Sequence, residues 1–514
     1  MEETRLSQGR KDKPEPSLFV PSHELYAHIP KRHFYEQLDK VLDLSFVYDL
    51  TRPLYAEKMG RPSLDPVVFF KCQLVGFFEN IIYDRELEFR IADSLTLRKF
   101  LGYSLDERTP DESTLRKTRA KMPEEAFRAV FDHVLDVCQS NGLVKGRAIG
   151  TDSTLVDANA AMDSLHHKEL GCSYEEYVLA LRRQEKPDAT AREAALADKG
   201  RVGKASNADW QSRTDPDARV MQHADGHTHL SYKVDATVDL ETGVIVSAGA
   251  ELANVSDQAD FLERVDEATE ALAERGLNPE VVVADKGHES GENLIGLEER
   301  ELVGLISSRN QYSGKPGFRR EDFTYDSETD TLICPAGRPL AKVASKDRKA
   351  HHYRTSGGVC KACPNFGICT KSKNGRSVMI SFYEDVIRRN KERVHSEAAR
   401  PLMQIRRQRG EAPFGYFKAF GGLRRMAGRG LAYAEKKALV AALGWNLLLL
   451  VKSITRSGTK WPILGLIQLA IALLQVITAA TVDKLLRPIG KARMSVLGHN
   501  PREQLKRACL SAGC

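Results

Sequence analysis

Three acidic residues lie where a carboxylate needs a partner. Asp152 interrupts the apolar segment AIGTDSTLVDA, Asp285 ends the apolar segment PEVVVAD, and Glu411 lies in the basic segment RRQRGEAPFGYFKAF. A carboxylate that folding removes from water costs several kcal/mol unless it pairs with a cation or binds a metal ion. An aspartate at a strand end is also a common turn or helix-cap residue, so each position alone leaves both interpretations open.

Brought together, the three carboxylates would form a site for metal-assisted phosphoryl transfer. Neighbouring carboxylates repel one another unless divalent cations neutralise them. Their hard oxygen ligands suit Mg²⁺ or Mn²⁺. Two such ions about 4 Å apart activate a water or hydroxyl and stabilise the leaving oxygen when a phosphodiester is cleaved. The fold must therefore unite three segments that are far apart in the sequence.

The charge near Glu411 favours a polyanionic substrate. The 514-residue chain has 76 Lys and Arg against 70 Asp and Glu, and its net charge of +6 does not by itself demand a nucleic-acid partner. Residues 371–430 alone hold 15 Lys and Arg against 5 Asp and Glu. On one helix, Arg407, Glu411 and Lys418 would lie within about 40° of one another. Pro413 requires this helix to be kinked or to begin near Glu411.

The N-terminal part is predicted to be all-helical. The composition, with 42% hydrophobic and 28% charged residues, excludes a disordered, collagen-like or coiled-coil chain. Residues 1–20 are interpreted as a flexible tail and residues 21–141 as short helices joined by tight turns. A basic helix among them favours a helix-turn-helix-like DNA-binding domain, whereas a helical bundle whose cations only confer solubility is an equal alternative. The cations that would contact DNA are Arg116, Lys117 and Arg119.

The middle of the chain alternates strands and helices. Residues 142–311 are predicted to form the first part of an α/β domain with a mixed sheet, including a hairpin that turns at Glu241-Thr242-Gly243. Residues 312–378, rich in Gly, Lys, Ser and Cys, are interpreted as an insertion, and 379–452 as the second part of the domain. The segment SVMISFY is predicted to be a strand that follows the insertion, and a basic, mostly helical segment comes after it. Residues 453–514 are predicted to be apolar C-terminal helices.

One uncharged stretch is long enough to span a bilayer. It runs from Trp461 to Val482 and contains Pro462, Gln468 and Gln475. A buried core or oligomer helix is favoured over a membrane span, because nothing else in the chain suits a membrane. The charged N-terminus has no apolar signal region, and nine sparse cysteines are typical of a cytoplasmic protein.

Four cysteines have the spacing of a structural metal site. Cys334 precedes Cys360 and Cys363, which form a C-x2-C pair, and Cys369 follows six residues later. Turn-rich cysteines of this kind suit tetrahedral Zn²⁺, and a small insertion without a large apolar core would gain stability from the ion. Free thiols and a redox disulfide are the alternatives.

The ordered motifs resemble those of bacterial insertion-sequence transposases with a DDE-type, RNase H-like catalytic domain. Arg407, Glu411 and Lys418 match the Y-x2-R-x3-E-x6-K signature, with Gln404 in the place of the tyrosine. GTDSTLVDAN and VVVADKGHES resemble the segments that carry the two aspartates, with His288 where a tyrosine is usual. LGWNLLLL is similar to the end of the catalytic domain, and the resemblance covers roughly residues 40 to 450.

The resemblance implies a DNA transposase with an RNase H-like mixed sheet and flanking helices. Asp152, Asp285 and Glu411 would bind two Mg²⁺ or Mn²⁺ ions, and Arg407 and Lys418 would contact DNA. The helical domain would bind terminal inverted repeats, and the enzyme would cleave the ends and transfer them to target DNA. Pairing two ends implies a homodimer or larger oligomer, associated with the nucleoid. A metal-dependent nuclease without strand transfer and a non-catalytic DNA-binding regulator are the alternatives.

Overall fold

The computed structural model describes residues 22–55, 63–201, 204–223, 225–308, 317–326, 328–344 and 350–455, with isolated positions at 474, 477 and 478. The predicted tail, residues 1–20, lies outside these ranges. The predicted C-terminal helices at 453–514 and the stretch Trp461 to Val482 also fall almost wholly outside them.

The N-terminal part is helical, as the sequence predicts. The side chain of Asp65 caps the apolar helix α4 by accepting hydrogen bonds from the N–H groups of Val67 and Val68, with Pro66 in its first turn. The helices are α1 (Ser22–Ala27), α2 (Phe34–Val41), α3 (Phe46–Thr51), α4 (Pro66–Phe78), α5 (Asp84–Asp93), α6 (Leu95–Leu101), α7 (Glu112–Lys121) and α8 (Glu124–Ser140).

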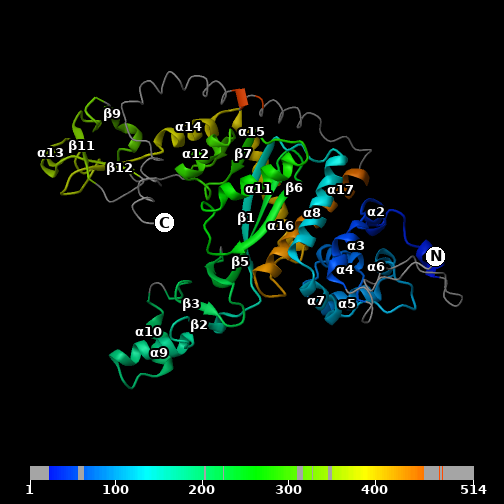
Figure 1. The fold of residues 1–514 in the computed structure, drawn as a ribbon. Coiled ribbons are helices and arrows are strands. Elements are labelled where there is room, and N and C mark those ends of the chain that lie inside the picture. The colour runs from blue at the N-terminus through cyan, green and yellow to red at the C-terminus, as the bar shows by residue number, and fades with distance from the viewer. Residues whose placement is uncertain are drawn as a thin grey trace.

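A mixed sheet forms the centre of the molecule (Figure 1). Its strands are β1 (Ala148–Asp157), β4 (Arg219–Gln222), β5 (Thr228–Asp239), β6 (Ile245–Leu252), β7 (Val281–Ala284) and β8 (Val303–Ile306). Strand β5 pairs antiparallel with β1 on one edge and with β4 and β6 on the other. Strands β1, β7 and β8 are parallel neighbours. The predicted hairpin is confirmed, and Gly243 allows its tight turn with a φ of 88°.

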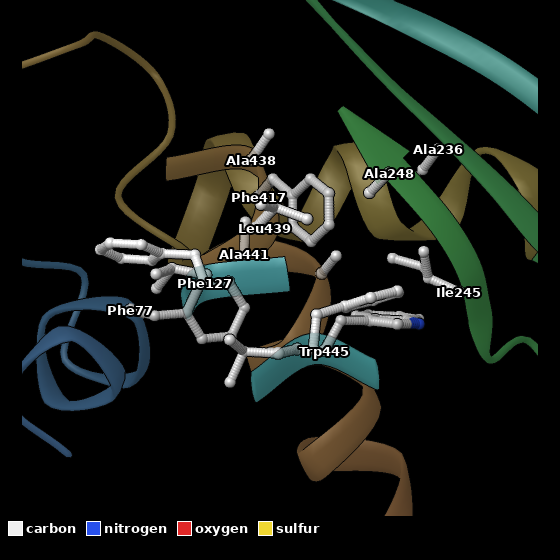
Figure 2. Packing of buried hydrophobic residues seen from close by; sticks show 14 of the residues in the cluster. Phe77, Phe127, Ala236, Ile245, Ala248, Phe417, Ala438, Leu439, Ala441 and Trp445 are labelled. Atoms are coloured by element: carbon white, nitrogen blue, oxygen red, sulfur yellow. The ribbon is translucent and has the colours of Figure 1, made fainter. Parts of the chain in front are cut away.

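Helices cover this sheet. They are α11 (Phe261–Ala273), α12 (Gly291–Glu299), α14 (Glu384–His395), α15 (Ala399–Ile405), α16 (Ala412–Phe420) and α17 (Leu431–Thr455). Helix α17 packs on β6 and on α8 and α4, so one continuous core joins the sheet to the N-terminal helices (Figure 2). Phe77, Phe127 and Ile245 all belong to this core, together with Trp445 of α17.

Polar contacts fix α17 on both sides. The Asn446 side chain accepts from the N–H of Ile245 and donates to its carbonyl, both at 2.8 Å. On the other side, Lys436 Nζ donates to the carbonyl of Met122, directly after α7, at 2.6 Å. Among the described helices only α17 is long and apolar enough to cross a membrane, but 67% of its apolar window is buried inside the protein. It is a core helix here.

A small arm is inserted between β1 and β5 and projects from the sheet in Figure 1. It consists of β2 (Leu165–His167), α9 (Tyr174–Glu185), α10 (Ala191–Asp198) and β3 (Trp210–Ser212). Trp210 is buried against the rings of His167, Tyr174 and Tyr177. The arm therefore has its own aromatic core.

A second, five-stranded antiparallel sheet follows the central one along the chain. Its order is β13-β12-β11-β10-β9, and a small core contains Leu332, Leu340 and Tyr353. The strand at 377–381 was expected in the second part of the central domain, but it pairs with β12, so the predicted boundary at residue 378 falls inside this sheet. The elements are β9 (Thr324–Asp326), β10 (Thr331–Ile333), β11 (Pro339–Val343), β12 (Ala350–Arg354), α13 (Gly357–Lys361) and β13 (Ser377–Ser381).

Replacing Asn446 tests how far α17 depends on its polar anchor. Asn446→Ala leaves the buried N–H and carbonyl of Ile245 without partners, so the free energy of unfolding should fall by about 2 kcal/mol. Ala432→Ser, at an exposed position of the same helix, should change it by less than about 0.5 kcal/mol. Urea denaturation measures both; equal stability of the two variants would contradict this role of Asn446.

Candidate active site

Neighbouring parallel strands bring Asp152 and Asp285 together. Gly150 of β1 lies beside Val283 of β7 in the parallel register. Two residues further along each chain, the same register sets Asp152 beside Asp285, which directly follows β7. The side chain of Asp152 is 21% exposed. Two of the three predicted carboxylates therefore share one edge of the sheet.

A π-helical turn brings the third carboxylate to the same place. Residues Arg406–Gly410 form this turn, and Glu411 caps α16 directly after it. Residues five apart lie about 140° apart around an α-helix, whereas a π turn sets them one turn above each other. The turn is held against the hairpin end by Arg409, which donates to the carbonyls of Leu240 and Glu241. Arg406 and Glu411 consequently face the same side.

Arg406 links the two segments directly. Its Nη1 donates to Asp152 Oδ2 at 3.3 Å and its Nη2 donates to Glu411 Oε1 at 3.2 Å. The Arg406 side chain is 9% exposed and Glu411 55%. A buried guanidinium thus lies between two of the three predicted metal ligands, although it is outside the signature that points to Arg407.

The two aspartates experience opposite electrostatic environments. Burial raises the pKa of Asp152, and the Ser153 N–H and the Arg406 charge oppose this rise. The hydrogen bond from His288 is the largest influence that lowers the pKa of Asp285, with help from the Gly287 N–H. His288 Nδ1 lies 2.8 Å from Asp285 Oδ1, and its buried ring packs on Phe261. Pairs of carboxylates with separated pKa values are typical of catalytic sites.

A fourth carboxylate, Asp257, lies near Asp285. Its Oδ1 accepts from Ser153 Oγ and from Lys233 Nζ, both at 3.0 Å. A methyl group on Gly287 would lie 2.8 Å from Asp285 Oδ1 and 3.3 Å from Asp257 Oδ2, so only glycine fits between them. Asp257 and Arg406 were missed because nothing in their local sequence marks them, and His288 was noted only as a residue that stands where a tyrosine is usual.

The ion pairs to Asp152 and Glu411 come from Arg406 and not from the signature cations Arg407 and Lys418. Arg407 and Lys418 are exposed. Lys418 interacts electrostatically with Asp157, five residues beyond Asp152 in β1 and hence about 17 Å along the strand. The interruption of the helix before α16 explains why Arg407, Glu411 and Lys418 do not form the single helical face that was expected.

The predicted DNA-contacting cations of α7 divide into two groups. Arg116 and Lys117 are exposed. Arg119 is buried, its guanidinium binds both oxygens of Asp84 at 2.5 and 2.7 Å, and its Nε donates to Gln73. This corrects the expectation for Arg119, because a guanidinium saturated by buried partners is not available to a phosphate.

The four predicted zinc ligands line one pocket on the second sheet. Cys334, Cys360, Cys363 and Cys369 border it together with Arg338 and Phe366. Backbone N–H groups of Arg338 and Arg376 donate to the sulfurs of Cys334 and Cys360 at 3.4 and 3.3 Å. In the part of the chain that the structure describes, no three His, Cys, Asp or Glu side chains are already placed to hold an ion between them.

Two models of known protein families match separate segments of the chain. A family model described as "Transposase domain (DUF772)" matches residues 23–121, which span α1 to α7. A second, described as "Transposase DDE domain", matches residues 333–451, which contain the cysteines and Glu411. These two segments of the chain therefore match transposase domains, the second of them of the DDE type.

The remaining comparisons add little to this transposase assignment. No curated protein matches the chain. A piggyBac transposase synaptic complex with hairpin DNA, solved by cryo-EM, is 10% identical, with 91% of this chain and 84% of that chain covered. Its TM-score is 0.28, and no conclusion is drawn from it. Asp152 and Asp285 lie between the two matched segments.

Arg406→Met tests the guanidinium as the counter-charge of this site. The variant leaves the partly buried Asp152 and Glu411 without the guanidinium that bonds both, so we expect the protein to lose about 2 kcal/mol of unfolding free energy at pH 7. Arg407→Met, at the exposed neighbour, should change it little.

The loss should depend on pH. Because the pKa of Asp152 is raised in the folded state, its ionisation destabilises the protein as pH rises through and above the ordinary aspartate range. Without Arg406 this penalty grows, so the difference between Arg406→Met and wild type should be larger at pH 7 than at pH 4. A difference independent of pH, measured by denaturant titration, would contradict this electrostatic role.

Proposed function

We propose that this DNA transposase binds the terminal inverted repeats of its element and catalyses metal-dependent DNA cleavage and strand transfer. The observation that supports the proposal is that Arg406 bonds both Asp152 and Glu411, while the register of β1 and β7 sets Asp285 beside Asp152. The antiparallel meander β6-β5-β1, continued by parallel β7 and β8, supports an RNase H-like catalytic domain.

The donor set suits hard divalent cations. Carboxylate oxygens from adjacent strand ends are the ligands that Mg²⁺ or Mn²⁺ prefers, and the proposed ligands are Asp152, Asp285 and Glu411. When bound, a pair of such ions supplies an activated nucleophile and stabilises the leaving oxygen. His288 and the Gly287 N–H orient Asp285 through its Oδ1. Arg406 neutralises the repulsion that would otherwise separate Asp152 and Glu411.

The chain's own residues would position DNA for two in-line displacements. In the first, water would attack a phosphodiester and release a 3′-hydroxyl; in the second, that hydroxyl would attack target DNA, without a covalent protein intermediate. Exposed Arg407 and Lys418 would contact phosphates near the site, and exposed Arg116 and Lys117 would face the terminal repeats. Juxtaposing two ends calls for a dimer or larger assembly.

The cysteine pocket would hold a structural zinc ion. Four thiols around one pocket provide the tetrahedral set that Zn²⁺ requires, and backbone N–H groups donate to two of the sulfurs. The core of the second sheet is small, with five fully buried apolar residues, so an ion would contribute much of its stability. We therefore assign residues 318–381 to a cysteine-rich insertion.

Cleavage of labelled DNA bearing the element's ends tests the active site. With Mg²⁺, Asp152→Asn and Asp285→Asn should each reduce the cleavage rate by more than about a hundredfold, since each loses a ligand for the charge-stabilising ions. Asp163→Asn, which alters an exposed acid of the arm, is the matched control. Full cleavage by either variant would refute the proposed active site. If the wild-type protein cleaved DNA without joining it, the nuclease alternative would be favoured. If it only bound DNA, the regulator alternative would be favoured.

Metal analysis tests the zinc assignment separately. Freshly purified, reduced protein should contain about one zinc per chain, and Cys363→Ser should lower this content and the thermal stability. Cys172→Ser, whose thiol lies outside the pocket, should leave both unchanged. Protein that is fully reduced and folded but free of zinc would reject the assignment.

A further inference from the structure

The cysteine-bearing sheet has an unusual charge. Residues 324–381, which span its five strands, hold ten Lys and Arg against four Asp and Glu, a surplus of six positive charges. This surplus equals the net charge of +6 of the whole chain. A small sheet with this excess attracts polyanions.

Most of these cations face solvent. Within the described residues of this sheet, only Lys342 among the exposed cations forms an ion pair, with Asp330 at 2.9 Å. Buried arginines elsewhere in the protein are neutralised, as Arg264 is by Asp260 and Glu251. The exposed cations of the sheet are Arg338, Lys342, Arg354, Lys361, Lys371 and Lys373.

Cations and apolar side chains alternate around the cysteine pocket. Arg338 lines the pocket, Lys361 directly follows Cys360, and Lys371 and Lys373 follow Cys369. The same loops expose large apolar side chains to solvent: Val359 by 39%, Phe366 by 39% and Ile368 by 59%. Phosphate contacts from Lys and Arg, combined with apolar contacts to sugars or bases, are typical of nucleic-acid interfaces.

The face of the sheet opposite the cysteine pocket also exposes apolar side chains and a cation. Leu340, Tyr353 and Val378 fill the core side. On the opposite face, Val343 and Met379 lie on either side of His352 in one cross-strand row. Their side chains are exposed by 38% and 58%. In the adjacent row Arg354 lies between the small residues Ala341 and Ser377, so its guanidinium stays accessible.

The segment that follows the cysteine-bearing sheet packs on elements next to the proposed active site. Helix α14 follows β13, and Asn390 of that helix bonds both backbone groups of Ile306 in β8. Tyr383, between β13 and α14, packs so closely on Gly291 that a methyl group there would overlap its ring. Gly291 begins α12, six residues after Asp285. DNA held at Asp285 would therefore lie close to this sheet.

We infer that the cysteine-bearing sheet is an additional binding surface for double-stranded DNA, contacting its phosphates through Lys361, Lys371 and Lys373 beside the cysteine pocket. Charge alone would fit any polyanion, so the choice of duplex DNA rests on the proposed function. The surface adds contacts outside the cleavage centre and steadies the duplex beside it. It is separate from α7 and from Arg407 and Lys418.

The test compares two triple variants of the full chain, each of which removes three positive charges. One is Lys361→Gln/Lys371→Gln/Lys373→Gln; the control, Lys145→Gln/Arg192→Gln/Lys199→Gln, changes exposed cations far from the sheet in sequence. Fluorescence anisotropy with a labelled duplex should show at least about a tenfold loss of affinity for the first variant at 0.1 M salt. For this variant, the slope of log affinity against log salt concentration should be smaller in magnitude than that of the wild type by about 2 to 3.

Several outcomes would overturn the inference. They are unchanged binding by the first variant, an equal loss in the control, or wild-type protein that does not bind duplex DNA. A change of oligomeric state with unchanged DNA binding would assign the surface to a second copy of the chain instead. Zinc content and melting temperature check that the variants fold. Cleavage is assayed separately, so a protein that binds through this sheet but never cuts would refute the proposed function alone.

Discussion

The whole candidate site depends on placing carboxylates in a partly buried position without letting them repel one another. Arg406 meets this constraint: its guanidinium bonds Asp152 from the first strand and Glu411 from a segment more than 250 residues later. The bridge exists only because a π turn, anchored by Arg409 on the hairpin end, directs Arg406 and Glu411 to one side. A local helical irregularity thus connects the sheet to the remote acidic residue.

The protein uses its cations in two ways. Arg119, Arg264 and Arg406 are buried and each bonds carboxylates, so they stabilise the fold. The lysines around the cysteine pocket are exposed and available to an anion. A sequence count of charges treats both kinds alike. Burial separates them, since a buried cation must be neutralised by the chain itself, whereas an exposed one is neutralised by ions or ligands.

The sequence was sufficient for the strands around Asp152 and Asp285, because apolar runs bounded by turns specify buried strands locally. It also predicted the N-terminal helices and the hairpin. It misplaced the strand at 377–381, whose partner in β12 is set by long-range pairing, and it assigned Arg119 to solvent. The roles of Arg406 and Asp257 could not be predicted from the sequence, because they arise from contacts between segments that only the folded chain brings together.

Helix α17 has a consequence for how far apart events on DNA can occur. Lys436 fastens it to the end of α7, and Asn446 fastens it to β6, so the module proposed to recognise the repeats and the sheet that carries Asp152 share one solid core. Under the proposed function, this core would fix the distance along DNA between the recognised sequence and the scissile phosphate, as a constant number of base pairs. If base pairs were inserted between the recognised sequence and the cleavage site, the cut would stay at the same distance from the recognised sequence.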